Sequence, residues 1–276
     1  MQNVTQIITS RQNPLVSLAA GLAERKIRRR EGMFRFDGKK LFREALCADL
    51  PLYAVLLRES NAREILDFVG DLSLSDDVRA ALLPDTLFDK ISEEKAPEGV
   101  ICISKTLDKF HKIVTIDKCA PENSVIPEGK TLLLESVRDP GNLGTIIRSA
   151  RAFGVKNLVL SSDCADLYNP RTIRAAMGTL FSQQVFMVED LVGVIAQLRR
   201  RGRVYAAALR EDAARLGEVS FGENDAALVG NEGHGLSDEA LAACSDTLYI
   251  PMECGVESLN AGIAASVILW ELYRGR

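Results

Sequence analysis

Short apolar runs and amphipathic stretches alternate along the whole chain of 276 residues. In the second half, six runs have the length of strands and lack polar alternation, and helical periodicity lies between most of them. These runs are TLLLES, NLVLSS, QVFMVE, RVYAAAL, DAALVG and TLYIPM. Such strands, alternating with helices, are typical of a mainly parallel sheet covered on both faces. The pattern predicts an α/β fold for this half.

The first hundred residues show the same alternation on a smaller scale. Residues 13–32 have helical spacing, with Pro14 in the first turn, where proline is favoured. MFRFDG, LYAVLLR and VICISK predict strands, whereas KKLFREALCADL and REILDFVG predict helices, the second ending at Gly70. We expect a small α/β domain with its own apolar core.

Periodicity weakens between Thr106 and Lys130, where proline and glycine interrupt the chain. Domain boundaries usually fall in such stretches. We therefore assign residues 1–108 to a first domain, 109–129 to a linker and 130–276 to a second domain.

Composition is ordinary for a globular protein, with 47% apolar and 26% charged residues. The longest uncharged apolar run, Ala261–Trp270, is too short to span a bilayer, and the N-terminus lacks the order of a secretory signal. Six cysteines form no CxxC pair and only two histidines accompany them, which argues against zinc and for a reducing compartment. We expect a cytoplasmic protein without a membrane span or a metal.

The net charge of −4 by itself argues against nucleic acid as a partner, but the charges are unevenly distributed. From Met1 to Arg43 there are ten Lys or Arg against three acids, a local net charge of +7, with KIRRR at its centre. Such a cluster predicts binding of RNA or DNA phosphates, and a solvated helix end is the alternative. The candidate contacts are Arg11, Lys26, Arg28, Arg29 and Arg30.

Three polar loops of the second half each contain glycine, follow a predicted strand and lead into a predicted helix. Open α/β sheets bind their ligands at such loops. In the first, residues 135–155, the pattern from Thr145 to Phe153 predicts a helix that Asn142 can cap. Arg148 is either a helix-surface arginine or, as its apolar neighbours suggest, partly buried. The loop matches neither the dinucleotide-binding fingerprint nor the P-loop, which disfavours a Rossmann-type nucleotide enzyme.

The second loop is LVGNEGHGLS at residues 228–237. Its three glycines surround Asn231, Glu232 and His234 and imply unusual backbone angles or close approach of a ligand. We interpret His234 as a loop residue or RNA contact rather than a general base.

The third loop precedes an apolar helix within residues 250–274. Glu257, Ser258 and Asn260 stand directly before this helix, and Gly262 permits close packing inside it. Asn260 or Ser258 can cap the helix, but a cap needs only one polar residue. Polar groups at such a junction are costly unless they are paired, so the surplus indicates a ligand.

The segments DPGNLGTIIRSARAFG, LVGNEGHGLS and IPMECGVESLNAGIAASVILWE occur in this order. Together they resemble three motifs of the SpoU, or TrmH-like, RNA 2′-O-methyltransferases of the SPOUT superfamily. The first domain resembles the RNA substrate-binding domain often fused to these enzymes, through ITSRQNPLV, MFRFDGKKLFREAL and ISEEKAPEGV. Asp37 and Glu98 depart from the glutamate and glutamine that are usual there.

The resemblance implies a deep trefoil knot in the parallel-sheet domain and S-adenosylmethionine as cofactor, contacted by Gly230, Ile250 and Leu259. It also implies a homodimer whose active site forms at the subunit interface. The positions that match the family's catalytic residues are Arg148, Asn142, Glu232, Ser258 and Asn260. We expect electrostatic stabilisation from the arginine rather than general base catalysis, because a guanidinium hardly deprotonates.

The resulting expectation is an S-adenosylmethionine-dependent RNA ribose 2′-O-methyltransferase. The fused first domain favours ribosomal RNA, by analogy with the family. One alternative is a tRNA 2′-O-methyltransferase. Another is a non-catalytic RNA-binding or ribosome-assembly protein that retains the fold, and the presence of all five catalytic positions argues against it.

Overall fold

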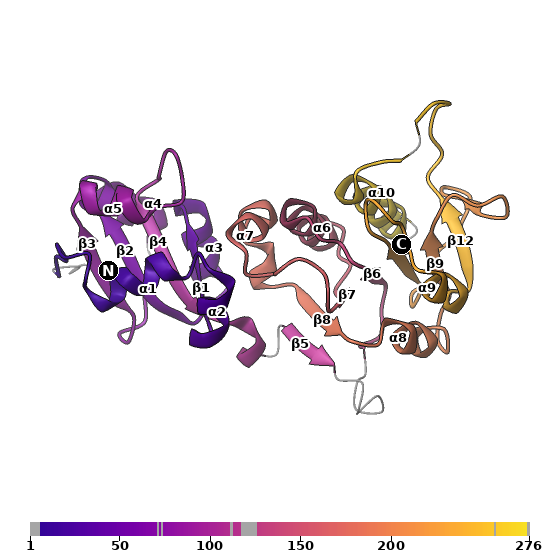
Figure 1. Cartoon of the computed structure of the whole chain (residues 1–276), viewed down its shortest axis with the longest axis horizontal. Coiled ribbons are helices and arrows are strands. Elements are labelled where there is room, and N and C mark those ends of the chain that lie inside the picture. Colours follow the sequence, from indigo (N-terminus) through magenta and orange to yellow (C-terminus); the bar gives the residue numbers. More distant parts are fainter. Residues whose placement is uncertain are drawn as a thin grey trace. The chain divides into compact units, whose positions relative to one another are not determined.

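A computed structural model describes residues 6–70, 72, 74–110, 113–116, 126–256 and 258–274. The chain divides into two compact units, which Figure 1 draws in sequence colours. Unit 1 comprises Met1–Lys109 and Tyr168–Ser182, and unit 2 comprises Phe110–Leu167 and Gln183–Arg276. A segment of the second half of the chain therefore packs within unit 1.

Unit 1 is built on a four-stranded sheet with the strand order β1-β4-β2-β3. Its strands are β1 (Met33–Asp37), β2 (Leu52–Arg58), β3 (Arg79–Leu83) and β4 (Val100–Lys105). β4 runs antiparallel to β1 and β2, and β2 runs parallel to β3. The three predicted strands are confirmed, and β3 was not predicted.

Helices cover both faces of this sheet. They are α1 (Pro14–Gly21), α2 (Arg25–Glu31), α3 (Lys39–Cys47), α4 (Ala62–Val69), α5 (Asp85–Ile91) and α7 (Pro170–Ala176). One apolar cluster joins α1 and α5 to β2, β3 and β4, while α3 packs against α4. The predicted helices over KKLFREALCADL and REILDFVG are confirmed, and α5 was not predicted.

Residues 13–32 form two helices, α1 and α2, rather than the single helix that their periodicity predicts. The guanidinium of Arg28 explains the break. Arg28 is only 4% exposed, and its Nη1 donates to the carbonyls of Leu22 and Ala23 at 2.9 and 2.6 Å. These carbonyls follow the end of α1, where a helix leaves acceptors without partners.

Arg35 is part of the basic N-terminal sequence, but its side chain is buried rather than at the surface. It is 1% exposed, and its guanidinium pairs with Asp37 at 2.5 Å. It also donates to the carbonyls of Ala19 and Ile91 at 3.0 and 2.8 Å. Arg35 therefore ties the ends of α1 and α5 to β1 and is not available to a partner.

Unit 2 contains an eight-stranded sheet in which every pairing is parallel, in the order β10-β12-β9-β11-β6-β7-β8-β5. Its strands are β5 (Ile113–Ile116), β6 (Thr131–Leu134), β7 (Asn157–Ser161), β8 (Gln184–Val188), β9 (Val204–Ala207), β10 (Ala214–Arg215), β11 (Ala226–Val229) and β12 (Asp246–Tyr249). All six predicted strands and the parallel α/β fold are confirmed. β5 is an edge strand inside the stretch that we assigned to a linker.

Two pairs of helices sandwich the sheet of unit 2. The helices α6 (Pro140–Ala152) and α10 (Ala261–Arg274) lie on one face, and α8 (Leu191–Leu198) and α9 (Asp238–Ala243) lie on the other (Figure 1). Both layers bury apolar side chains against the strands, as the uninterrupted apolar runs predict. The knot stays a prediction. None of the described helices has the length and hydropathy needed to cross a membrane.

Candidate active site

The first motif loop leads from β6 into α6. Asp139, not Asn142, caps this helix: its Oδ1 accepts a hydrogen bond from the backbone N–H of Asn142 at 2.9 Å. Pro140 occupies the first helical turn, where its missing N–H costs nothing. The helix thus begins five residues earlier than predicted, and the side chain of Asn142 is left for other partners.

A chain of hydrogen bonds joins the three motif loops through Asn142. Its Nδ2 donates to Oε1 of Glu232 at 2.5 Å, and its Oδ1 accepts from Nδ2 of Asn260 at 2.9 Å. Oδ1 of Asn260 accepts from the backbone N–H groups of Gly262 and Ile263, so Asn260 caps α10, as we expected it could. A Cβ on Gly262 would lie 3.1 Å from Oδ1 of Asn260, so a side chain at this position would crowd the cap of α10.

The second motif loop folds into a closed turn after β11. The backbones of Asn231 and Gly235 exchange two hydrogen bonds of 3.0 Å, and Oδ1 of Asn231 accepts from the N–H groups of Gly233 and His234. A Cβ on Gly230 would lie 2.5 Å from the carbonyl carbon of Gly235, and Gly235 itself has a φ of 69°. The unusual backbone angles that the glycines predict are confirmed.

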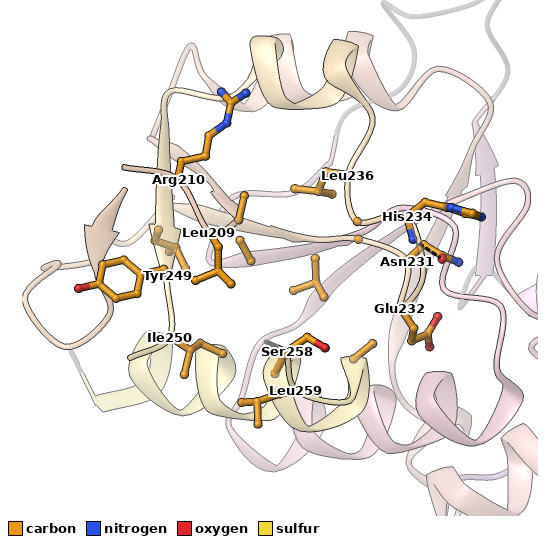
Figure 2. Close-up of a pocket in the computed structure, with 18 of the residues that line it drawn as sticks. Leu209, Arg210, Asn231, Glu232, His234, Leu236, Tyr249, Ile250, Ser258 and Leu259 are labelled. Atoms are coloured by element: carbon orange, nitrogen blue, oxygen red, sulfur yellow. Dashed lines mark hydrogen bonds between the residues drawn. The ribbon is translucent and has the colours of Figure 1, made fainter. Parts of the chain in front are cut away.

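A cavity of about 440 Å³ lies beside this turn, within unit 2. The ends of β9, β11 and β12 and the start of α10 surround it, and most lining side chains are apolar. Figure 2 shows Ile250, Ser258 and Leu259 along one side and Leu236 across from them. A mostly apolar cavity with a few polar groups is typical of a small-molecule site.

Of the predicted catalytic and cofactor-binding residues, five line this cavity: Gly230, Glu232, Ile250, Ser258 and Leu259. Glu232 is the one carboxylate among the described lining residues. The hydroxyl of Ser258 has no hydrogen-bond partner in the part of the chain that the structure describes. Asn142 and Asn260 do not line the cavity but reach it through Glu232. Glu257 lies outside the described residues.

Arg148 lies apart from these residues. It is exposed on α6, does not line the cavity and has no hydrogen bond or ion pair among the described residues. The partial burial that its apolar neighbours suggest is wrong, because Ile146, Ile147 and Ala150 face the core while the 3.6-residue period turns position 148 away from it. Within one chain, the structure does not bring Arg148 together with the other four catalytic candidates.

A polar cluster at the ends of β6 and β7 supports the second motif loop, and the sequence reading missed it. Ser136 has a left-handed φ of 55°, and its carbonyl accepts from Nδ2 of Asn231 at 2.7 Å. Its hydroxyl donates to Asp163 at 2.5 Å, as does that of Ser161 at 2.6 Å. Partial burial alone would raise the pKa of Asp163, but these bonds and that from Arg138 hold the pKa below its usual value.

The loop after β9 supplies a further side of the cavity that sequence reasoning did not find. Leu209 and Arg210 line it, and Leu209 is 63% exposed. This loop has no glycine cluster and no surplus of polar residues at a helix start, so the criterion used for the other three loops could not find it.

Two parts of this chain match known protein families. Residues 129–270 match the family described as SpoU rRNA Methylase family. The chain belongs to this family. Residues 13–102 match the MRM3-like substrate binding domain. The SpoU match spans all three motif loops, the cavity and α6.

Relatives extend the similarity over nearly the full chain. A 23S rRNA (guanosine(2553)-2′-O)-methyltransferase, RlmP of Bacillus subtilis, is 29% identical and covers 96% of this chain and 98% of its own length. A TrmH-family structure from Porphyromonas gingivalis is 31% identical over 94% of this chain and 96% of that chain, with a TM-score of 0.76. The SpoU methyltransferase AviRb of Streptomyces viridochromogenes, solved in complex with AdoMet, is 25% identical over 95% and 98%, with a TM-score of 0.75.

The basic N-terminal cluster is only partly at the surface. Arg11, Lys26, Arg29 and Arg30 are exposed, and Nε of Arg30 lies 2.8 Å from Oε1 of Glu31. Arg28 is buried on the carbonyls after α1 and cannot also bind a phosphate. The prediction that Arg28 contacts RNA is therefore corrected, whereas the other four positions remain candidates.

Three of the described cysteines are buried. Burial raises the pKa of the thiols of Cys102 and Cys164, and that of Cys244 to about 12, so these thiols stay protonated at neutral pH. His234 lines the cavity, and its side chain extends away from Leu209 and Leu236 in Figure 2. In the described ranges, no three His, Cys, Asp or Glu side chains form a metal-binding group.

Proposed function

We propose that this member of the SpoU family transfers a methyl group from S-adenosylmethionine to a ribose 2′-hydroxyl of ribosomal RNA. RlmP is named as a 2′-O-methyltransferase of 23S rRNA, and AviRb was solved in complex with AdoMet. The present chain covers 98% of the length of each. The protein acts in the cytoplasm as a homodimer. Unit 1 binds RNA and unit 2 performs the transfer, which is the division that the two family matches support.

One observation supports the proposal most directly: residues from three separate loops form one hydrogen-bonded network, and one of them, Glu232, lines the cavity. Glu232 lines the cavity and is hydrogen-bonded to Asn142, which is hydrogen-bonded to Asn260. Side chains that are 90 and 118 residues apart in the chain are thus fixed within one network. A structural cap would need only Asn260, so the network has a function beyond folding.

The cavity fits S-adenosylmethionine in size and chemistry. Its apolar side chains, Ile250 and Leu259 among them, suit the adenosine, and Gly230 and Gly235 of the closed turn add no side chain to its lining. Glu232 suits the positive charge of a sulfonium or an amino group. When bound, the cofactor supplies an electrophilic methyl group. The residues around it must position a ribose hydroxyl and exclude water.

Polar side chains at one end of the cavity are placed to handle that hydroxyl. Ser258 is exposed and has no described partner, so its Oγ can donate to or accept from the ribose. Asn142 and Asn260 hold Glu232 in one orientation and require no rearrangement when RNA binds. The network is therefore preorganised, which is the property that lowers barriers in polar sites.

Arg148 completes the site from the second subunit. It is exposed on α6, away from the cavity of its own chain. The neighbouring surface of α10 exposes Ile263, Trp270 and Tyr273 at 54%, 47% and 41%. Their spacing places these apolar side chains on one face of the helix, beside Phe153, whose ring centroid lies 5.6 Å from that of Trp270. An apolar patch of this kind on a symmetric protein suits a twofold interface.

In this arrangement the guanidinium of Arg148 lies across the interface from the partner's cavity. It holds the phosphate next to the target ribose and stabilises the negative charge that develops on the 2′-oxygen. Since a guanidinium stays protonated, it does not serve as the base.

Transfer of a labelled methyl group tests the proposal. The purified protein is incubated with methyl-labelled S-adenosylmethionine and total RNA from a strain that lacks its gene, and the RNA is separated by size. Label in ribosomal RNA supports the proposal, whereas label in the tRNA fraction moves the substrate to tRNA. No label from free RNA or from ribosomal particles, with the cofactor still bound, would indicate a non-catalytic RNA-binding protein.

A further inference from the structure

A second hollow lies within unit 1, and none of its lining residues belongs to the candidate active site. Its volume is about 360 Å³, and residues of α1, α2, β2 and β3 line it. Leu15, Leu18 and Ile27 form its apolar part and pack against the core of unit 1. This volume falls within the range of small-molecule sites and is large enough for a nucleobase.

A stacked pair of side chains lines this hollow. Cζ of Arg79 lies 4.9 Å from the centroid of the Tyr53 ring, so the guanidinium lies over the aromatic face. Arg79 is exposed at the start of the edge strand β3, and Tyr53 is half-buried against the core. Arginine planes and aromatic rings are the surfaces on which proteins stack unpaired RNA bases.

The charged side chains of the hollow include a carboxylate besides the guanidinium groups of Arg30 and Arg79. Arg30 and Glu31 also line it, and the two side chains pair at 2.8 Å. A carboxylate repels a phosphate but accepts hydrogen bonds from the amino and imino groups of a base. A phosphate of the same RNA can instead bind Lys26, which is exposed on the same helix, α2.

We infer that the hollow formed around Tyr53 and Arg79 binds one unpaired base of the RNA substrate, with a flanking phosphate on Lys26. The inference rests on the proposed function, since it assumes that RNA is the substrate. It assigns unit 1 the recognition of a single-stranded nucleotide. A base inside a duplex is stacked and cannot enter a hollow of this kind.

RNA binding by the full chain tests the inference. The probes are a fluorescein-labelled single-stranded RNA of about twelve nucleotides and the same sequence as a blunt duplex, followed by fluorescence anisotropy. The variants are Tyr53→Leu, Arg79→Gln and Arg79→Lys, with Arg63→Gln as the charge-matched control on α4. Arg63 is exposed and does not line the hollow.

All three variants at the hollow should bind the single strand roughly fivefold or more weakly. The Arg79 variants remove the plane on which the base stacks, and Tyr53→Leu removes the ring that holds this plane in place. Duplex binding should change only as much as in Arg63→Gln. The lysine variant separates stacking from charge, since it keeps the charge and loses the plane. Arg79 is exposed, so its variants remain informative even if Tyr53→Leu fails to fold.

An Arg79→Lys protein with wild-type affinity for the single strand would overturn the inference. So would an equal loss of affinity for duplex and single strand. Methyl transfer by the same preparations separates this result from the proposed function. If the wild type transfers methyl groups normally and the variants bind RNA as the wild type does, the hollow does not bind a base, and the proposed function is unaffected. Variant-sensitive binding without any transfer refutes the proposed function alone.

Discussion

Nδ2 of Asn142 lies 2.5 Å from Oε1 of Glu232, although 90 residues separate them in the chain. The other end of the same amide accepts a hydrogen bond from Asn260 at 2.9 Å. Position 142 therefore needs a donor on one side and an acceptor on the other, and among short side chains an amide supplies both. This pair joins the α6 loop to the cavity, and the predicted effects of substitution follow from it.

Asn142→Asp should lower kcat for methyl transfer by roughly 10²-fold, because it replaces the donor facing Glu232 with a second carboxylate oxygen. Two carboxylates in contact share a proton, so part of the activity should return as the pH falls. A pH profile of kcat for the variant and the wild type measures both effects. A variant with wild-type rate and profile would show that the Asn142–Glu232 bond has no role in turnover.

Arg148→Ala should lower kcat by about 10²–10³, the usual loss for one preorganised donor. The affinity for S-adenosylmethionine should not change, because Arg148 does not line the cavity of its own chain. Calorimetry and single-turnover kinetics measure the two quantities. A near-normal rate would refute the assigned role of Arg148.

Subunit exchange tests whether Arg148 acts across the dimer. Arg148→Ala and Glu232→Gln should each be inactive as homodimers. A hybrid of the two contains one site in which both residues are native, so random exchange should restore about a quarter of the wild-type activity. Absence of recovery after exchange, with hybrids demonstrated by mass spectrometry, would place Arg148 at the cavity of its own subunit.

Gly230→Ala should weaken cofactor binding, since its Cβ would lie 2.5 Å from the backbone of Gly235 and open the turn. Forced overpacking of this kind typically costs about 1–3 kcal/mol. Gly233→Ala is the matched control from the same loop, where the added Cβ meets Oδ1 of Asn231 at 3.4 Å. Equal affinities of the two variants for S-adenosylmethionine would contradict the account.

The exposed and the buried basic residues of α2 should respond differently to substitution. Lys26→Ala with Arg29→Ala should weaken RNA binding and reduce the salt slope by roughly 0.7 for each lost phosphate contact with a single strand. Arg28→Met should leave the slope unchanged and destabilise the protein by about 1–3 kcal/mol, because it leaves buried carbonyls without their donor. An unchanged slope in the first variant would mean that the cluster faces solvent or the partner subunit.

The stability that Asp163 contributes near the second motif loop should decrease at acid pH. Hydrogen bonds hold its pKa below the usual value, so the stabilisation is fully present above the pKa of an unfolded aspartate, about 4. It is lost as the pH falls through the lowered pKa of the folded state. Asp163→Asn should flatten this acid dependence in urea unfolding. An unaltered dependence would assign the acid sensitivity to other groups.

The sequence predicted much of the fold because apolar periodicity reflects burial directly. All six strands expected in the second half are present, and the parallel sheet follows from their uninterrupted apolar character. β3 and β5 were missed because they are edge strands in which exposed positions interrupt the apolar run, as at Arg79 in β3 and Thr115 in β5. The break between α1 and α2 depends on Arg28 reaching back to two carbonyls, a contact that local patterns do not reveal.

The candidate site was predictable in its members but not in its connections. Glycine and polar residues between a strand and a helix identified Gly230, Glu232 and Ser258, which all line the cavity. The cap of α6 was misassigned because Asp139 and Asn142 are both favoured at such positions, and only geometry decides between them. The cluster of Ser136 and Asp163 brings together residues from two strand ends, which a linear reading does not join.

The identity of the methylated nucleoside tests the central claim most directly. RNA labelled by the wild-type protein is digested to nucleosides and separated by chromatography with mass detection. The account predicts that the label is in a 2′-O-methyl ribonucleoside and is absent after reaction with Arg148→Ala. Label on a base instead would contradict the chemistry assigned to Arg148, Glu232 and Ser258.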